Sequence, residues 1–163
     1  MVKDLNIHDR IVQALKDLAE AYPQYSKVMP YLSKREPILI PFETYTVKYY
    51  PDLWAETKKL KRVDVYEVWH TESEDQAIAD MYLCAKTPNL LNVCIVCVKT
   101  RSDSWTKDYA KNIVDTVLKD LENRYTSLKS IRTQGHIYLA EVGRNELRTD
   151  ATLRASLSKQ FEF

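Results

Sequence analysis

The chain has 163 residues, a length that suits one domain over residues 1–163 with a sizeable hydrophobic core. Its 24 basic residues nearly balance its 23 acidic ones, so no overall basic field indicates a nucleic-acid or membrane partner. Two glycines, Gly135 and Gly143, cannot form the glycine-rich phosphate loops of nucleotide-binding proteins. The longest apolar run, 93–98, is too short to cross a bilayer, and the polar N-terminus lacks a signal-peptide pattern.

Three cysteines and no export signal favour a reducing, cytoplasmic setting. Cys94 and Cys97 have the C-x-x-C spacing of zinc and redox sites, but they lie in an apolar segment typical of a strand. Residues three apart in a strand point to opposite faces. No second cysteine or histidine pair is present to complete a zinc site. We therefore expect these cysteines, and Cys84, to be buried as small hydrophobic side chains.

The first half of the chain predicts a helix followed by three strands. Asn6 can cap a helix that ends before Pro23, and a second short helix is expected over 26–33, strained by Pro30. Residues rich in β-branched and aromatic types then predict strands at 38–47, 49–56 and 62–70. The short basic segment between the last two strands suits a hairpin turn.

The second half alternates helices with strands. Thr71 and Ser73 begin two overlapping capping boxes, which predict a helix over 74–86. The continuous apolar run at 90–98 is typical of a central strand covered on both faces. A helix capped by Ser104, a strand over 136–142 and a helix over 145–159 follow. This order predicts an α/β fold, a mixed five-stranded sheet flanked by helices with right-handed parallel crossovers in its second half.

The hairpin over 49–70 brings two acids together. If its turn is centred between Lys59 and Leu60, Asp52 lies opposite Glu67, with Trp54, Val65 and Trp69 on the same face. Facing carboxylates repel one another by about 0.2–1 kcal/mol when exposed, and a bound Mg²⁺ would remove this cost. A turn one residue longer or shorter would abolish the pairing. The alternative is a solvated hairpin face.

The segment Pro51-Asp52, fourteen residues, then Glu67-Val68-Trp69 resembles the PD-(D/E)XK nuclease superfamily, which has the restriction-endonuclease-like fold. The resemblance covers roughly residues 7–98 and includes the αβββαβ element order. It implies that Asp52 and Glu67 bind a catalytic Mg²⁺ or Mn²⁺ ion from the second and third strands. It also implies a third acidic ligand from the first helix, for which Glu20 is the best-placed match and Glu43, on the first strand, a weaker one.

The chain departs from the family pattern at its lysine, because Trp69 stands at that position. In the family this lysine orients the attacking water and offsets charge on the phosphate, which tryptophan cannot do. Other cations are possible substitutes. Counted by alternation, Lys48 shares the face of Asp52, whereas His70 points to the other face. Lys58 and Lys99 are further possibilities.

The resemblance implies a metal-dependent endonuclease or phosphodiesterase that holds DNA through its phosphates. The expected phosphate contacts are basic residues of the hairpin tip and of the segment after the fourth strand: Lys58, Lys59, Lys61, Arg62, Lys99, Arg101 and Lys107. Charges at a hairpin tip also serve to block edge association. The competing hypothesis is a catalytically inactive protein of the same fold that binds nucleic acid or a protein partner, including a second copy of itself. A third is an unrelated α/β domain with another hairpin register.

Overall fold

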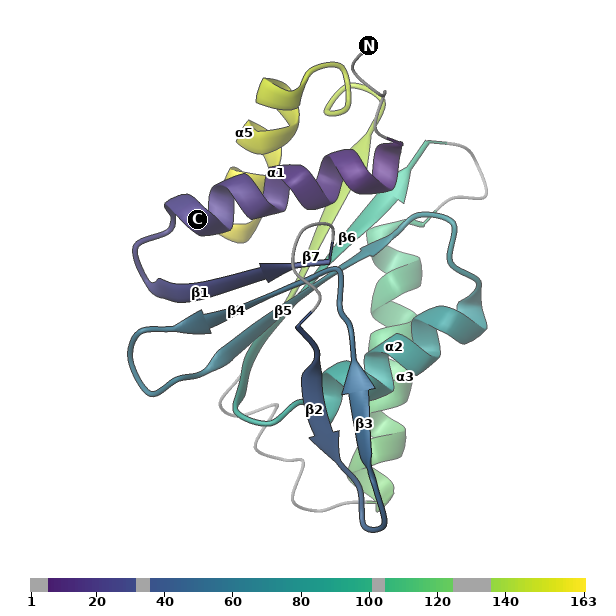
Figure 1. Ribbon diagram of the computed structural model, residues 1–163. Helices are drawn as coiled ribbons and strands as arrows, with labels where there is room; N and C mark the ends of the chain where they lie inside the picture. Colours follow the sequence, from purple (N-terminus) through teal and green to yellow (C-terminus); the bar gives the residue numbers. More distant parts are fainter. Residues whose placement is uncertain (1–5, 32–35, 101–104, 125–135) are drawn as a thin grey trace.

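The protein is built around a mixed five-stranded sheet, shown in Figure 1. This computed structural model describes residues 6–31, 36–100, 105–124 and 136–163. The strands lie in the order β1-β4-β5-β6-β7, with β1, β4 and β5 antiparallel and β5, β6 and β7 parallel. Their bounds are Tyr25–Pro30 for β1, Leu53–Thr57 for β4, Val63–Trp69 for β5, Leu90–Lys99 for β6 and His136–Gly143 for β7. The predicted α/β class and mixed five-stranded sheet are confirmed.

Helices cover both faces of this sheet (Figure 1). Helices α1 (Ile7–Ala21) and α5 (Asp150–Phe161) pack on one face, where Leu15, Leu53 and Val96 belong to a shared apolar core. Helices α2 (Glu74–Ala85) and α3 (Lys107–Arg124) pack on the other face, around Val65 and Ile95. The sheet is therefore the middle layer between two hydrophobic cores. None of the described helices is long and apolar enough to cross a membrane.

Strand β6 lies at the centre of the parallel half, as its apolar sequence predicts. Its residues from Val93 to Val98 are all buried. Cys94 packs in the core beneath α1 and α5, whereas Cys97 packs in the core beneath α2 and α3. The C-x-x-C thiols thus point to opposite faces, and both are free and buried.

Two expected elements are wrong. Residues 26–33 were expected to be helical, but β1 is an edge strand that pairs with β4 from Tyr25 to Pro30. The single strand expected over 38–47 is instead a hairpin of β2 (Ile38–Pro41) and β3 (Thr46–Tyr49), which forms a separate two-stranded sheet. The first error arises because pairing with the distant strand β4 overrides local preference. The second arises because a turn over 42–45 folds the segment back on itself.

The helix boundaries follow capping chemistry. Ser73 and Gln76 form the capping box expected at the start of α2. The last helix begins at Asp150 and not at 145, because the side chain of Thr149 accepts a hydrogen bond from the backbone N–H of Thr152. Ser104, expected to cap α3, lies outside the described residues.

Candidate metal-binding site

The β4–β5 hairpin has the register that the sequence predicts. Trp54 pairs with Val65 and Glu56 with Val63. The same pairing, continued beyond Leu53 and Tyr66, places Asp52 opposite Glu67. The turn lies at residues 58–61, so its centre is between Lys59 and Leu60.

The carboxyl groups of Asp52 and Glu67 are neighbours. Glu67 lies on the face of the sheet that carries α2 and α3, and Asp52 directly precedes β4. Glu67 is 5% exposed and close enough to Asp52 for a hydrogen bond between the two carboxyls. Burial raises the pKa of Glu67 well above its usual range, and the negative charges of Asp52 and Asp80 raise it further. Without a bound cation, burial and the neighbouring negative charges therefore favour the protonated form of Glu67.

A hydrogen-bonded chain leads from the interior to Glu67. The Tyr49 hydroxyl, at the end of β3, donates to Oε1 of Glu67. Cys84 of α2 has its Sγ 3.1 Å from the Tyr49 hydroxyl oxygen, to which its S–H can donate. Burial raises the pKa of Tyr49 and of Cys84 well above their usual ranges, so both groups stay neutral. The β2–β3 hairpin thus positions the Glu67 carboxyl from outside the main sheet.

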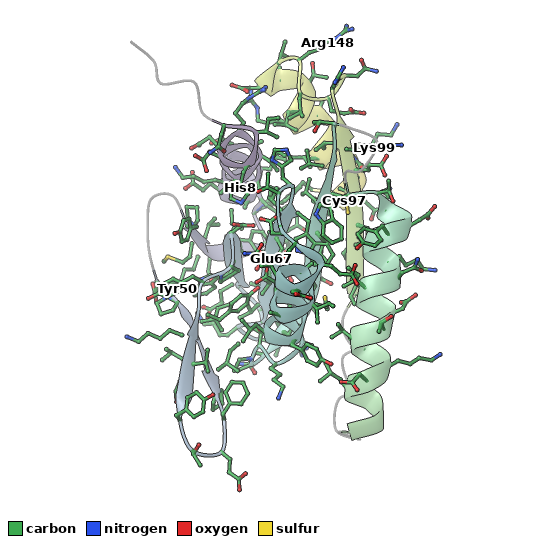
Figure 2. All side chains as sticks on the ribbon, turned by 90° about the vertical axis from the view of Figure 1, so that its right-hand side faces the viewer. His8, Tyr50, Glu67, Cys97, Lys99 and Arg148 are labelled. Carbon is green, nitrogen blue, oxygen red and sulfur yellow. The ribbon has the colours of Figure 1, made fainter. Side chains whose placement is uncertain are left out.

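Asp52 is held by contacts from two other elements. Its Oδ2 accepts a hydrogen bond of 2.8 Å from the backbone N–H of Val68, which fixes the carboxyl across the β4–β5 pair. Its Oδ1 lies 3.0 Å from Nε2 of His8, near the start of α1. That hydrogen bond is the largest cause that raises the pKa of His8 to about 9, against the lowering effect of burial. At neutral pH His8 is therefore a cation beside the acid pair (Figure 2 labels His8 and Glu67).

Two more carboxylates lie near the pair. Asp80 on α2 has its pKa raised to about 6, first by burial and then by the charges of Asp52 and Glu72. The charge of Glu72 also contributes to the raised pKa of His8. This end of the sheet therefore concentrates negative charge, which favours a cation.

The donor set fits a hard divalent ion that keeps part of its water shell. Among the described residues, no group of three or more His, Cys, Asp or Glu side chains could enclose a metal ion. Mg²⁺ is commonly held by one or two carboxylates together with water and phosphate oxygens. Asp52 and Glu67 would supply these two carboxylates, with the remaining positions open to water or substrate.

The third expected ligand, Glu20, is not brought to this site. It is exposed near the end of α1 and lies 3.9 Å from Lys16 in an ion pair. His8, twelve residues earlier, is the α1 residue that contacts Asp52. At 1.5 Å per residue, Glu20 lies about 18 Å further along the helix. Glu43 is exposed in the turn between β2 and β3, outside the main sheet.

The position of the family's lysine is part of the hydrophobic core. Trp69 is 1% exposed, and its ring centroid lies 5.0 Å from that of Trp105. Lys48 was expected on the face of Asp52, but it is exposed on β3 opposite Leu39. Its neighbour Tyr49 is the residue that reaches Glu67. The alternation count failed here because β3 belongs to the smaller sheet.

His70 and the basic residues lie away from the acid pair. The backbone N–H of His70 donates to Glu72. The hairpin tip with Lys58, Lys59, Lys61 and Arg62 is six or more residues of extended chain from Asp52, about 20 Å. Arg62 donates to the backbone oxygens of Asn89 and Leu90, and Lys61 pairs with Glu56 at 3.7 Å.

Lys99 is the last residue of β6, and it lies at the same end of the sheet as Glu67 in the C-terminal half of the parallel strand β5. It is exposed two residues beyond Cys97, which pairs with Trp69 (Figure 2). Lys107, at the start of α3, has its backbone N–H bonded to Glu141. Arg101 lies outside the described residues.

The sequence reasoning missed three participants. His8 has no local signal, because its partner is 44 positions away in the chain. The approach of Tyr49 on β3 to Glu67 likewise has no local signal. Asp80 did have one. It interrupts the buried stripe of α2 that Ala77 and Cys84 form, and a carboxylate on such a stripe indicates a polar site.

Comparison with known proteins adds no identification. No protein-family model, curated protein or solved structure matches the chain.

Proposed function

We propose that the protein is a Mg²⁺- or Mn²⁺-dependent phosphodiesterase of the restriction-endonuclease-like class that acts on nucleic acid, with DNA as the expected substrate. The observation that carries the proposal is the juxtaposition of the Asp52 and Glu67 carboxyl groups where β4 pairs with β5. A buried acid whose pKa is raised by burial and by a neighbouring carboxylate is suited to a divalent cation.

The element order supports the same proposal. Leaving aside the β2–β3 hairpin, the main elements read α1, β1, β4, β5, α2, β6, which is an αβββαβ order. Asp52 directly precedes the second of these three antiparallel strands and Glu67 lies on the third. These are the positions that the superfamily resemblance assigns to its metal ligands. The β2–β3 hairpin is then an insertion between the first and second strands.

Asp52, Glu67 and His8 would each have a different role in phosphodiester hydrolysis. Asp52 and Glu67 would hold the ion, which would supply polarisation of the phosphate and a lower pKa for a coordinated water. Val68 fixes the orientation of Asp52 through its backbone N–H. His8, a cation at neutral pH, lies where it can offset charge on a bound phosphate, the part that the family gives to its lysine.

The test is cleavage of supercoiled plasmid, linear duplex and branched DNA with Mg²⁺, Mn²⁺ or EDTA. We expect metal-dependent cleavage that Asp52→Asn and Glu67→Gln each lower at least 100-fold. Asp108→Asn removes the same charge from exposed α3 and should leave the rate unchanged. Cleavage that survives Asp52→Asn would contradict the proposed site.

A second candidate function is a non-catalytic protein of the same class that binds nucleic acid or a protein partner. The buried Trp69 at the lysine position favours it. This candidate predicts that DNA binds and that Mg²⁺ occupies the Asp52–Glu67 pair, but that no substrate is cut. A gel-shift measurement beside the cleavage assay separates the two functions.

A further inference from the structure

A second polar cavity lies on the opposite face of the sheet, below α1 and α5. It has a volume of about 190 Å³ and is separate from the Asp52–Glu67 site. Asp64 lines it near the start of β5, whereas Glu67 is three residues later and points to the other face. Six aromatic side chains form most of its wall: Tyr22, Tyr25, Tyr66, Tyr138, Phe161 and Phe163.

The cavity contains an incompletely bonded buried carboxylate. Asp64 is 5% exposed, and its Oδ2 accepts a hydrogen bond of 2.6 Å from the Tyr25 hydroxyl. Its Oδ1 has no hydrogen bond of ordinary geometry within the described chain. Burial raises the pKa of Asp64, and the nearby Tyr25 and Asn92 oppose that rise. The side-chain oxygen of Asn92 is likewise without a partner within the described chain. Buried acceptors of this kind normally have a donor.

The Tyr25 and Tyr66 hydroxyls, which lie nearest to Asp64, do not donate to its Oδ1. Tyr25 gives its proton to Asp64, so its oxygen accepts from the neighbouring Tyr66 hydroxyl. Burial raises the pKa of both tyrosines well above their usual range, so they stay protonated and these directions are fixed. The acceptors without a partner in this cavity are Oδ1 of Asp64 and Oδ1 of Asn92, and Glu162 adds a further carboxylate to the lining.

We propose that this cavity binds the ammonium group of a small alkylamine, with Asp64 as its counter-ion. An ammonium group carries three donors and a positive charge, which match the acceptors of Asp64 and Asn92. Its alkyl part would lie against the aromatic side chains of the wall. The faces of these rings would also attract the ammonium group. A cavity of 190 Å³ has the volume of about six water molecules, enough for an amine of four or five heavy atoms.

The wall distinguishes an organic cation from a metal ion. Ca²⁺ takes six to eight oxygen ligands, whereas rings form most of this lining. The Tyr22 and Tyr25 rings meet edge to face at 5.0 Å between centroids, and Tyr66 stacks on Phe163 at 6.0 Å. Asp64, Asn92 and Glu162 are the lining residues that carry carboxylate or amide oxygens, which are fewer groups than Ca²⁺ requires.

The experiment is isothermal titration of the full chain with n-butylamine hydrochloride at pH 7. A titration with n-butanol tests a ligand of similar shape without the charge. A titration with KCl tests a cation without the alkyl chain. We expect saturable binding of butylammonium and none of butanol or K⁺. Asp64→Asn keeps the side-chain shape and should weaken binding at least tenfold, whereas Asp108→Asn should leave the affinity unchanged. Circular dichroism verifies that each variant is folded.

Several results would overturn the assignment. These are butanol or K⁺ binding as tightly as butylammonium, undiminished binding in Asp64→Asn, and no saturable heat at 10 mM amine. If Asp64→Asn fails to fold, Tyr25→Phe is the second variant. It removes the hydroxyl that orients Asp64 but keeps the ring, so butylammonium affinity should fall at least threefold. Unchanged affinity in Tyr25→Phe would then count against the site.

Discussion

His8 shows how strongly the acid pair affects its surroundings. Its side chain is 26% exposed, and contact with Asp52 raises its pKa from the ordinary 6.5 to about 9. Because the folded-state pKa is above the unfolded one, protonated His8 stabilises the fold fully below about pH 6.5. This contribution is lost as the pH rises through about 9.

Proton NMR of the metal-free protein from pH 5 to 10 should therefore show His8 titrating near pH 9. The chain has three histidines, and His8→Gln assigns the signal. Asp52→Asn removes the partner that is the largest cause of the shift, so the His8 pKa should fall by at least one unit. A His8 signal that titrates below pH 7 in the unmodified protein would show that the contact with Asp52 does not form.

Trp69 decides whether the family's lysine can be restored by one substitution. Trp69→Lys would remove a ring packed on Trp105 and bury a charge in its place. We expect a loss of about 3–5 kcal/mol in the free energy of unfolding, measured by urea denaturation, and no gain in cleavage.

Trp69→Phe is the matched control for that substitution. It retains an aromatic ring in the core and removes an indole N–H that has no hydrogen-bond partner within the described chain. Its stability loss should be less than half that of Trp69→Lys. If Trp69→Lys were as stable as the unmodified protein, the position would not belong to the core.

Among the elements, the register of the β4–β5 hairpin could be predicted to the residue, although the strand expected over 49–56 begins only at Leu53. Alternation of apolar and polar side chains and a short basic turn define its register, and Trp54 facing Val65 confirms it. The capping box of α2 and the buried strand β6 could be predicted for the same reason, since each depends on residues close in sequence.

Contacts between distant segments could not be predicted in this way. Strand β1 contains Pro30 and one β-branched residue, Val28, and it is extended because β4 offers it an edge to pair with. His8 reaches Asp52 because α1 packs across the main sheet, and Tyr49 reaches Glu67 because β3 leaves that sheet. The acid pair was therefore predictable from local pattern, but its partners were not.

The hairpin turn contains backbone strain that can be tested directly. Leu60 is 83% exposed with a φ of 61°, in the left-handed region that disfavours side chains with a Cβ atom. Leu60→Gly should raise the free energy of unfolding by about 0.5–1 kcal/mol in urea denaturation.

A leucine-to-glycine substitution on the exposed strand β2 should change the free energy of unfolding in the opposite direction. Leu39→Gly should lower the free energy of unfolding by about 0.5–1 kcal/mol, because glycine weakens a strand and strain is not relieved there. Equal destabilisation by both substitutions would show that the turn does not hold Leu60 in the left-handed conformation.

At the scale of the whole molecule, the two candidate sites lie on opposite faces of one sheet. Glu67 of the acid pair contacts Tyr49 in the core beneath α2 and α3, and the Asp64 cavity lies beneath α1 and α5. Strand β5 connects them, since it contributes Glu67 to one face and Asp64 to the other. Each site has its own buried carboxylate, so a change at one can be measured without removing the other.

Global stability gives a test of the metal site that does not depend on catalysis. A cation that binds the folded protein alone stabilises it by RT ln(1 + [L]/Kd), which is about 1.4 kcal/mol at ten times Kd. For a chain of this size that corresponds to a rise of about 3–6 °C in Tm. We expect MgCl₂ or MnCl₂ to raise Tm in a scanning-fluorimetry titration, relative to NaCl of equal ionic strength. Asp52→Asn should abolish the rise, whereas Asp108→Asn and Asp64→Asn should retain it. A rise of the same size in Asp52→Asn would place the bound ion elsewhere.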